Sequence, residues 1–403
     1  MSATPGSVAR FLARPGVASF AGIFVVTMLG LLAIGATLPV LPRYVKGPLD
    51  SGDLEVGIVA GAFAVTGLAG RPLAGRFADA RGRKPAVLLG AGLTALAGAL
   101  YFLPELLPVG VPGLIVARLV LGVGEGMVYT AGAAWVVDLS PPHMRGRVIG
   151  LYGLAIWGGL TLGPVIGELL LRASSFELVW AFAAGAPLVG ALIALRIPES
   201  FRPAAAGAAG ERPPLIAREA LRPGLGLGLG IVGYATVAAF IVLHLDQEGI
   251  GHGATVFTVF AATVVITRIV AGGLPDRLGP ARCAAGAGLV EAGGLLAIAF
   301  AGELGIALAG AVAMGAAFSL LFPALALLVL DGVPVERRGS AMGTFTAFFD
   351  LGVGVGSPVA GAAAALAGYP AAFVVAAMAS VGTFAVAVGL KRAMTGEPAA
   401  ARA

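Results

Sequence analysis

The sequence predicts an all-α membrane protein with twelve transmembrane helices in two six-helix halves. Of its 403 residues, 58% are hydrophobic and only 12% are charged, and the mean hydropathy is +0.97. These values exclude an ordinary soluble domain. Twelve apolar stretches are each long enough to cross the ~30 Å hydrocarbon layer of a bilayer. Two charged segments recur at offsets of 197 and 193 residues, which indicates that the halves are related units.

The apolar stretches of each half follow one another with short connections. In the N-terminal half, 1–197, they are 18–41, 54–76, 85–104, 111–136, 146–170 and 178–197. In the C-terminal half, 223–403, they are 224–247, 253–274, 281–302, 304–330, 339–366 and 370–391. Residues 198–222 are rich in Ala, Gly and Pro and lack an apolar period, so they are predicted to be a cytoplasmic linker. A short amphipathic helix on the membrane surface is expected around Leu215–Leu221.

The positive charges predict the orientation in the membrane. Arg43, Lys46 and Arg172 fall in the outer loops, whereas twenty of the 26 Lys and Arg residues fall on the inner side. Both termini are therefore expected in the cytoplasm. Residues 1–17 lack a convincing signal-peptide cleavage site and are interpreted as a tail before a retained first helix. The expected location is the cell inner membrane.

The composition also argues against several functions. The pI is near 9.7, but the basic residues lie in short loops and no basic helix is interleaved with aromatics, so nucleic-acid binding is not expected. The single cysteine, Cys283, excludes a disulfide framework, and the three histidines have no metal-ligand spacing. No phosphate-binding loop supports ATP-driven transport. We therefore expect no enzyme activity, no cofactor and no metal site.

One charged segment is repeated in the two halves. Gly75–Lys84 carries five charges and recurs 197 positions later as Gly272–Arg282, and the upstream Arg71 and Arg268 match at the same offset. A tight turn accounts for Gly82. The acid in this basic loop, Asp79, needs a guanidinium or a helix N-terminus as its partner. A second repeat matches Asp138–Gly146 to Asp331–Gly339.

Both copies of the first segment resemble the loop between the second and third helices of major facilitator superfamily transporters, G-x-L-A-D-R-x-G-R-K. The first copy departs at Phe77 and Ala80, and the second loses the basic pair. The resemblance implies a cytoplasmic latch, in which Asp79 caps the eleventh helix near Gly339 and Arg83 meets Asp138. The expected latch residues are Gly75, Asp79, Gly82, Arg83, Asp138, Asp276 and Arg277. The alternative is a basic loop that only sets the topology.

The stretch 111–136 carries buried charge. Arg118-Leu-Val-Leu-Gly122-Val-Gly-Glu125 resembles the superfamily pattern R-x-x-x-G-x-G, and Arg118, Gly122, Glu125 and Tyr129 form one helical stripe. A charge at that depth marks a functional candidate, although a pair that only locks the helix is the alternative. The proton-coupling candidates are Glu125, Asp350 and Arg118. Of these, Glu125 is preferred, with movement relative to Arg118 switching its protonation.

The stretch 146–170 contains Gly159, Gly163, Pro164 and Gly167, similar to the G-x-x-x-G-P-x-x-G pattern of antiporters in the superfamily, drug/proton exporters in particular. This resemblance favours export over import. Glycines four apart also form a groove against a partner helix, so close packing is the alternative interpretation. Glu168 replaces the second glycine often found at the outer end of the pattern.

Aromatic residues of the cavity-type helices suit a largely apolar organic substrate, although such residues face lipid or core more often. The cavity candidates are Tyr129, Tyr152, Trp157, Tyr234, Phe318, Phe322, Phe345 and Phe349. In the superfamily the second and eleventh helices face each other, so Arg71 is expected to pair with Asp350. Glu291 lies in a helix that is peripheral in the superfamily, and a local structural role is expected for it.

The sequence thus predicts a monomeric transporter that exports a small, largely apolar organic compound in exchange for protons. Alternating access would come from rocking of 1–197 against 223–391. One alternative is a carrier of a sugar or another nutrient on the same fold. Another is a transport-inactive membrane sensor, for which the intracellular segments are short. The substrate, the coupling ion and its stoichiometry stay open at this point.

Overall fold

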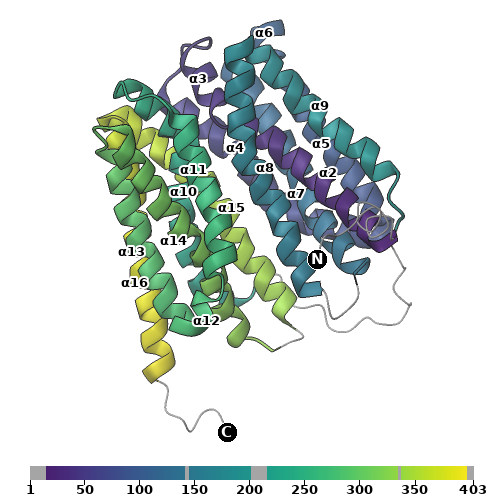
Figure 1. Cartoon of the computed structure of the whole chain (residues 1–403), viewed down its shortest axis with the longest axis vertical. Helices are drawn as coiled ribbons and strands as arrows, with labels where there is room; N and C mark the ends of the chain where they lie inside the picture. The colour runs from purple at the N-terminus through teal and green to yellow at the C-terminus, as the bar shows by residue number, and fades with distance from the viewer. Residues whose placement is uncertain (1–14, 141–144, 201–215, 335–336, 397–403) are drawn as a thin grey trace, which may run out of the picture. The chain divides into compact units, whose positions relative to one another are not determined.

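The structure is a computed structural model that describes residues 15–140, 145–200, 216–334 and 337–396. All regular secondary structure within these ranges is helical (Figure 1). Twelve helical spans in the described part are long and apolar enough to cross a membrane. The predicted all-α membrane fold with twelve transmembrane helices is therefore confirmed.

The helices of the first part of the chain correspond to the first six predicted stretches. They are α2 (Pro15–Thr37), α3 (Val40–Lys46), α4 (Asp53–Arg81), α5 (Arg83–Leu100), α6 (Leu103–Leu106), α7 (Gly110–Asp138), α8 (Arg145–Ala173) and α9 (Phe176–Leu195). The first stretch forms two helices because the chain turns at Leu38–Pro39 before α3 begins.

The second part of the chain follows the same pattern. Its elements are the 3-10 helix η2 (Arg218–Ala220) and the α-helices α10 (Leu221–Gln247), α11 (Gly253–Ala271), α12 (Leu274–Leu278), α13 (Pro280–Ala299), α14 (Leu304–Asp331), α15 (Arg338–Ala367) and α16 (Tyr369–Gly396). The amphipathic helix expected around Leu215–Leu221 begins outside the described residues. From Ile216 onward the chain forms η2 and the first residue of α10.

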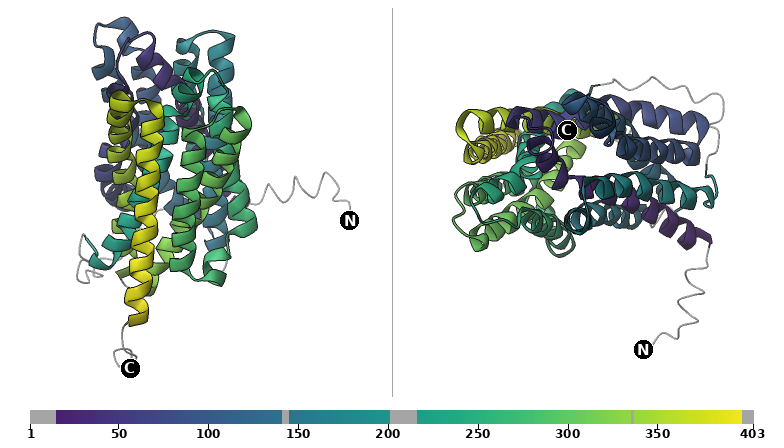
Figure 2. Two further views of the ribbon diagram at one scale, coloured as in Figure 1. Left: turned by 90° about the vertical axis from the view of Figure 1, so that its left-hand side faces the viewer. Right: turned by 90° about the horizontal axis from the view of Figure 1, so that it is seen from above.

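The helices group into two compact units. Unit 1 comprises the described residues of 1–37 and 69–208, and unit 2 those of 38–68 and 209–403. The long helix α4 contributes its first part to unit 2 and its last part to unit 1. Contacts thus assign 38–68 to the second unit, although in chain order this segment belongs to the first six stretches. Within each unit the helices run alongside one another (Figure 2).

Small residues and charges attach 38–68 to unit 2. A Cβ on Gly361 of α15 would lie 2.6 Å from the Asp53 carbonyl, and one on Gly61 of α4 would lie 3.1 Å from Cδ of Pro358. Helix backbones can approach this closely only where side chains are absent. Asp53 Oδ1 also lies 3.0 Å from Nζ of Lys46 and accepts a 3.0 Å hydrogen bond from the Tyr369 hydroxyl.

Glycine turns separate α4 from α5 and α12 from α13. Gly82 has φ of +107° and Gly279 has φ of +86°, a region that favours glycine because it has no Cβ. The two glycines are 197 positions apart, so the repeat seen in the sequence is also a repeat of backbone conformation. The predicted turn at Gly82 is confirmed. The predicted loop is shorter than expected, because α4 continues through Arg81.

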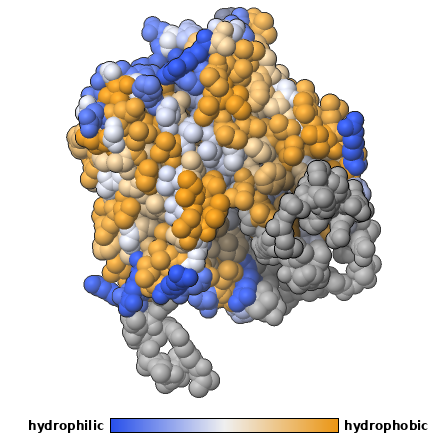
Figure 3. All heavy atoms as spheres, in the orientation of Figure 1, coloured by the Kyte–Doolittle hydropathy of each residue, from blue (hydrophilic) through white to orange (hydrophobic). Residues whose placement is uncertain are grey.

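Apolar side chains cover much of the molecular surface. In Figure 3 hydrophobic atoms spread across the middle of the visible face, and hydrophilic residues gather toward the ends of the helices. Leu73, Val270 and Leu366 are 61%, 81% and 88% exposed. A soluble protein seldom exposes large apolar side chains in such continuous areas, whereas lipid tails accept them.

Candidate functional site

Three polar side chains meet inside unit 1, where α4 packs beside α7. The Arg71 Nη2 atom lies 3.8 Å from Oε2 of Glu125, and the Arg71 guanidinium lies 4.9 Å from the centre of the Tyr129 ring. The side chains of Arg71 and Glu125 are only 20% and 12% exposed. The arrangement combines an ion pair with a cation–π contact, and places an ionisable carboxyl within a membrane helix.

A buried tyrosine extends this group to α2 and α8. The Thr27 hydroxyl donates a 3.1 Å hydrogen bond to Oη of Tyr152. In turn the Tyr152 hydroxyl lies 3.4 and 3.3 Å from the carbonyls of Val128 and Tyr129 on α7. Gly132 provides the necessary space, because a Cβ there would lie 2.5 Å from the tyrosine oxygen. We call Thr27, Arg71, Glu125, Tyr129 and Tyr152 the unit 1 polar network.

One guanidinium beside Glu125 therefore belongs to Arg71, which was not predicted as its neighbour from the sequence. Arg118 is 2% exposed and lies on the same helix as Glu125, seven residues before it. That spacing corresponds to ~10 Å along the axis, and the approach of Glu125 to Arg118 that the sequence suggested stays a prediction. The expected pair of Arg71 with Asp350, which is itself 2% exposed on α15, joins the two units and stays a prediction.

The glycines of α8 pack against α2. A Cβ on Gly35 would lie 3.0 Å from the Cα of Gly163 and 3.3 Å from Cδ of Pro164. Gly167 is in equally close contact with the Ala36 backbone, and a Cβ on Gly159 would lie 2.7 Å from Cβ of Leu31. The close packing that this glycine spacing predicts is thus observed, with α2 as the partner helix.

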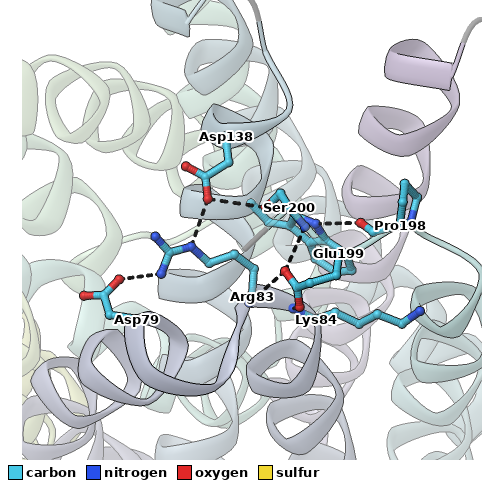
Figure 4. A network of polar contacts seen from close by, with 8 residues as sticks. Asp79, Arg83, Lys84, Asp138, Pro198, Glu199 and Ser200 are labelled. Carbon is cyan, nitrogen blue, oxygen red and sulfur yellow. Dashed lines mark hydrogen bonds and ion pairs between the residues drawn. The ribbon is translucent and has the colours of Figure 1, made fainter. Parts of the chain in front are cut away.

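The residues at the ends of α4, α7 and α9 form a second polar network (Figure 4). The Nε atom of Arg83 donates a 3.0 Å hydrogen bond to Asp138, and a second nitrogen of its guanidinium donates to Asp79. The predicted approach of Arg83 to Asp138 is confirmed. Asp79 is 70% exposed in this arrangement. Its expected contact with the start of the eleventh stretch joins the two units and stays a prediction.

Residues at the start of the linker complete this network, which the sequence analysis missed. Glu199 accepts hydrogen bonds from the backbone N–H groups of Arg83 and Lys84 at 3.2 and 2.9 Å, and so caps the N-terminus of α5. Lys84 Nζ donates to the carbonyls of Leu195 and Ile197 at 2.6 and 3.0 Å, at the end of α9. The sequence did contain a signal for this cap, because Glu199 directly follows Pro198 at the end of the apolar stretch 178–197.

Other expected latch residues lie apart from this network. A Cβ added to Gly75 would meet nothing within 4 Å, so packing does not require glycine there. Asp276 and Arg277 of the second copy lie exposed on α12.

In unit 2, four phenylalanine rings surround Tyr234. The ring centres of Phe257, Phe260, Phe318 and Phe349 lie 6.5, 6.1, 5.5 and 6.2 Å from the centre of the Tyr234 ring. Tyr234, Phe318 and Phe349 were predicted from the sequence as cavity residues, and the structure brings their rings together. The prediction from sequence did not include Phe257 and Phe260 of α11, because aromatic residues in membrane helices more often face lipid. We call these five residues the Tyr234 cluster.

The remaining cavity candidates lie outside that cluster. Phe322 and Phe345 form a separate pair with ring centres 5.3 Å apart. Trp157 is half-buried on α8, where its carbonyl accepts a hydrogen bond from Thr161. In the described part of the chain, no three His, Cys, Asp or Glu side chains are grouped so that they could hold a metal ion.

The repeated arginines have different partners. Arg268 of α11, the counterpart of Arg71, donates a 3.2 Å hydrogen bond from Nη2 to the carbonyl of Ser319. That carbonyl lacks its normal helical donor because residue 323, four positions later, is proline. Arg268 therefore satisfies a backbone group that the proline leaves open. The two units resemble each other in sequence but use their matched charges differently.

The twelve long apolar helical spans of the described residues define a multi-pass membrane protein. A model of the Major Facilitator Superfamily matches residues 23–255 and 225–403. The chain is 34% identical over 356 residues to an uncharacterized MFS-type transporter of Salmonella typhimurium, covering 87% of this chain and 90% of that protein. It is also 34% identical to one from Pseudomonas aeruginosa, with 91% of each chain covered. The chain belongs to the Major Facilitator Superfamily and is a secondary transporter.

Solved structures agree with this fold. The human organic anion transporter MFSD10 superposes with a TM-score of 0.70 at 21% identity, covering 93% of this chain and 99% of that one. A D-xylose-proton symporter gives a TM-score of 0.73 at 18% identity, with 92% and 97% covered. Two six-helix halves related by a pseudo-twofold axis are typical of this superfamily. Identities this low carry the fold alone.

Proposed function

We propose that this protein exports a small, largely apolar organic compound across the bacterial inner membrane in exchange for protons. It would work as a monomer with both termini in the cytoplasm, and resembles the drug/proton antiporter branch of the superfamily. The observation that carries the proposal is the contact of Arg71 with Glu125 inside unit 1, at 3.8 Å. A carboxyl beside a guanidinium in a membrane helix is a group that can bind and release a proton during a cycle.

Glu125 is the proton carrier in this proposal. When ionised, the carboxylate pairs with Arg71, and the positive charge offsets the cost of holding a carboxylate in the membrane. When protonated, it no longer attracts the positive charge of Arg71, whose guanidinium keeps its contact with the Tyr129 ring at 4.9 Å. Tyr152 fixes the α7 backbone at Tyr129, and so keeps the ring in place while the charge changes.

The Tyr234 cluster supports an apolar substrate. Its rings come from α10, α11, α14 and α15, so a planar apolar compound could exchange contacts with several helices. The glycine–proline pattern of α8 supports export, by resemblance to antiporters. Asp350, next to Phe349 in sequence and buried, is the competing proton carrier.

A carrier of sugars or other nutrients is the second candidate. A D-xylose-proton symporter shares the fold, but a sugar site needs many hydrogen-bonding side chains. The four phenylalanine rings around Tyr234 favour an apolar ligand instead. The human organic anion transporter that shares the fold suggests an anionic substrate. In the described conformation, however, the Arg71 guanidinium that would bind such an anion already faces Glu125.

Transport in proteoliposomes tests the proposal. Purified protein is reconstituted, a panel of labelled apolar cations and neutral drugs is screened by counterflow, and uphill movement is then driven by an imposed pH gradient. We expect Glu125→Gln to abolish uphill export while downhill exchange survives. The matched control is Glu303→Gln, an exposed acid before α14, which should behave as wild type. Uphill export by Glu125→Gln at the wild-type rate and pH profile would move the assignment to Asp350.

A further inference from the structure

Glu291 is a fully buried carboxyl that the unit 1 polar network does not involve. It lies near the middle of α13 in unit 2 and is 0% exposed. Neither of its carboxyl oxygens has a hydrogen-bond partner among the described residues. An unpaired ionised carboxylate inside a membrane is costly. A purely structural role, as expected from the sequence, would call for a partner that offsets this cost.

Two glycines of α10 form the space that this carboxyl occupies. A Cβ on Gly233 would lie 2.6 Å from Oε1 of Glu291, and one on Gly230 would lie 3.3 Å from its Oε2. Residues three apart lie on the same face of a helix, so both glycines face the acid. Any larger residue at Gly233 would displace the carboxyl.

Close helix packing encloses the group on its other sides. One turn before Glu291, a Cβ on Gly288 would lie 2.8 Å from the Ser380 carbonyl of α16. One turn after it, a Cβ on Gly294 would lie 2.7 Å from the Gly310 carbonyl of α14. These contacts hold α13 close to α16 and α14 on either side of the acid.

A hydroxyl group of α16, that of Thr383, lies near this space and favours the neutral form of the acid. The Thr383 hydroxyl lies 3.6 Å from the Cβ position of Gly230, beside the same glycine that Glu291 approaches. It donates its proton to the Gly226 carbonyl at 2.9 Å. Its oxygen is thus left as an acceptor, which complements the O–H of a carboxylic acid and repels a carboxylate.

Among the described residues, the helices packed against α13 place no charged partner on Glu291. They are α10, α12, α14 and α16. Their charged and titratable residues, together with those of α13, are Arg222, Tyr234, His244, Asp246, Asp276, Arg277, Arg282, Cys283, Asp331, Tyr369, Lys391 and Arg392. Tyr234 belongs to the aromatic cluster, and His244 bonds to the Ile298 carbonyl, which is seven residues or ~10 Å along α13 from Glu291. The others lie toward the helix ends.

We infer that Glu291 and the glycine pair Gly230 and Gly233 form a second proton-binding site, separate from Glu125. The ligand is a proton, which converts the carboxylate to a neutral carboxylic acid without a counter-ion. If the side chain served only to fill space, an apolar residue of the same volume would do so at lower cost. The site binds its proton within unit 2, and its occupancy does not depend on the transport activity proposed above.

Infrared spectroscopy of the purified protein in lipid bilayers at neutral pH tests this site directly. A protonated carboxyl gives a carbonyl-stretch band that an ionised carboxylate lacks, and the band shifts in deuterated buffer. We expect the wild-type protein to show it and Glu291→Gln to lose that contribution. Glu303→Gln, at an exposed position, should leave the spectrum unchanged. A wild-type spectrum without the band, or a band that Glu291→Gln leaves intact, would overturn the inference.

A second variant keeps the test decisive if Glu291→Gln does not fold. Gly233→Ala places a methyl group against the carboxyl, so the band should move in frequency while the acid is retained. The matched control is Gly293→Ala on α13, where a Cβ meets nothing within 4 Å. Equal spectra for the two alanine variants would also contradict the site. Since no substrate enters these measurements, they can succeed even if the transport proposal fails.

Discussion

Arg268 on α11 donates a hydrogen bond to the Ser319 carbonyl on α14, at 3.2 Å. The bond matters because Pro323 has no N–H to donate to that carbonyl. We therefore expect Arg268→Ala to lower the free energy of unfolding by about 1 kcal/mol, the usual scale for hydrogen bonds between membrane helices. In a Pro323→Ala background the new backbone N–H satisfies Ser319, and the same substitution should cost less. A double-mutant cycle from reversible unfolding in detergent measures this difference. Equal costs in both backgrounds would show that the bond is incidental.

The contact between Arg71 and Glu125 predicts energetic coupling. Removing either side chain takes away the neighbouring charge of the other in a poorly hydrated site. The losses of stability in Arg71→Gln and Glu125→Gln should therefore add up to more than the loss in the double variant. Thermal unfolding of the four proteins at neutral pH gives the interaction energy. Additive effects would mean that the 3.8 Å approach is not an interaction. The same cycle with Asp350→Asn tests the pair that the sequence suggested, and coupling there alone would replace our assignment.

Close packing of α8 on α2 predicts different outcomes for two glycines on one helix. A Cβ on Gly163 would lie 2.6 Å from the Gly35 Cα, whereas one on Gly158 meets nothing within 4 Å. Gly163→Ala should therefore force the helices apart and lower stability by about 1–3 kcal/mol, the usual cost of overpacking. Gly158→Ala should be neutral or slightly stabilising, since alanine favours helix. Comparable melting temperatures for the two variants would remove the structural basis of the groove.

The capping of α5 by Glu199 gives a further prediction. Glu199→Ala removes the acceptor for two N–H groups of the first turn, and the expected loss of stability is about 1 kcal/mol. Glu105→Ala, at an exposed acid on α6, is the control. Limited proteolysis after residue 200 offers a second measurement, because the start of the linker is held by Glu199. If Glu199→Ala melts and is cleaved like the control, the cap contributes nothing.

The length of the apolar stretches made the helices predictable, and the glycine in the charged loop made the turn predictable. The resemblance of that loop to the superfamily motif predicted one side-chain contact beside the turn. Gly82 at positive φ and the Arg83–Asp138 bond both follow from one short motif. The partner of Glu125 does not. Helical spacing places a residue along its own axis, but the rotation of one helix against its neighbour decides whether Arg71 reaches the acid. Glu199 was missed because its cap joins residues 115 positions apart in the chain.

The latch expected from the resemblance to the superfamily yields the last prediction. Arg83 holds Asp79 and Asp138 together by binding Oδ1 of Asp79, while Asp79 stays 70% exposed and has a second carboxylate oxygen, Oδ2. The resemblance to the superfamily assigns that oxygen to the N-terminus of the eleventh helix. A carboxylate there stabilises the positive end of the helix dipole by about 0.3–1 kcal/mol. Asp79→Asn keeps the shape and removes the charge, so it should weaken the state closed toward the cytoplasm without unfolding unit 1.

Cysteine accessibility in inverted and right-side-out vesicles measures that shift. With Asp79→Asn we expect faster labelling of cytoplasm-facing reporter cysteines and slower transport. Asp276→Asn, the exposed counterpart on α12 in the copy that lacks the basic pair, is the matched comparison and should have the smaller effect. If Asp79→Asn changes neither labelling nor transport, the segment serves only to set the topology. Its arginines would then act through their positive charge alone.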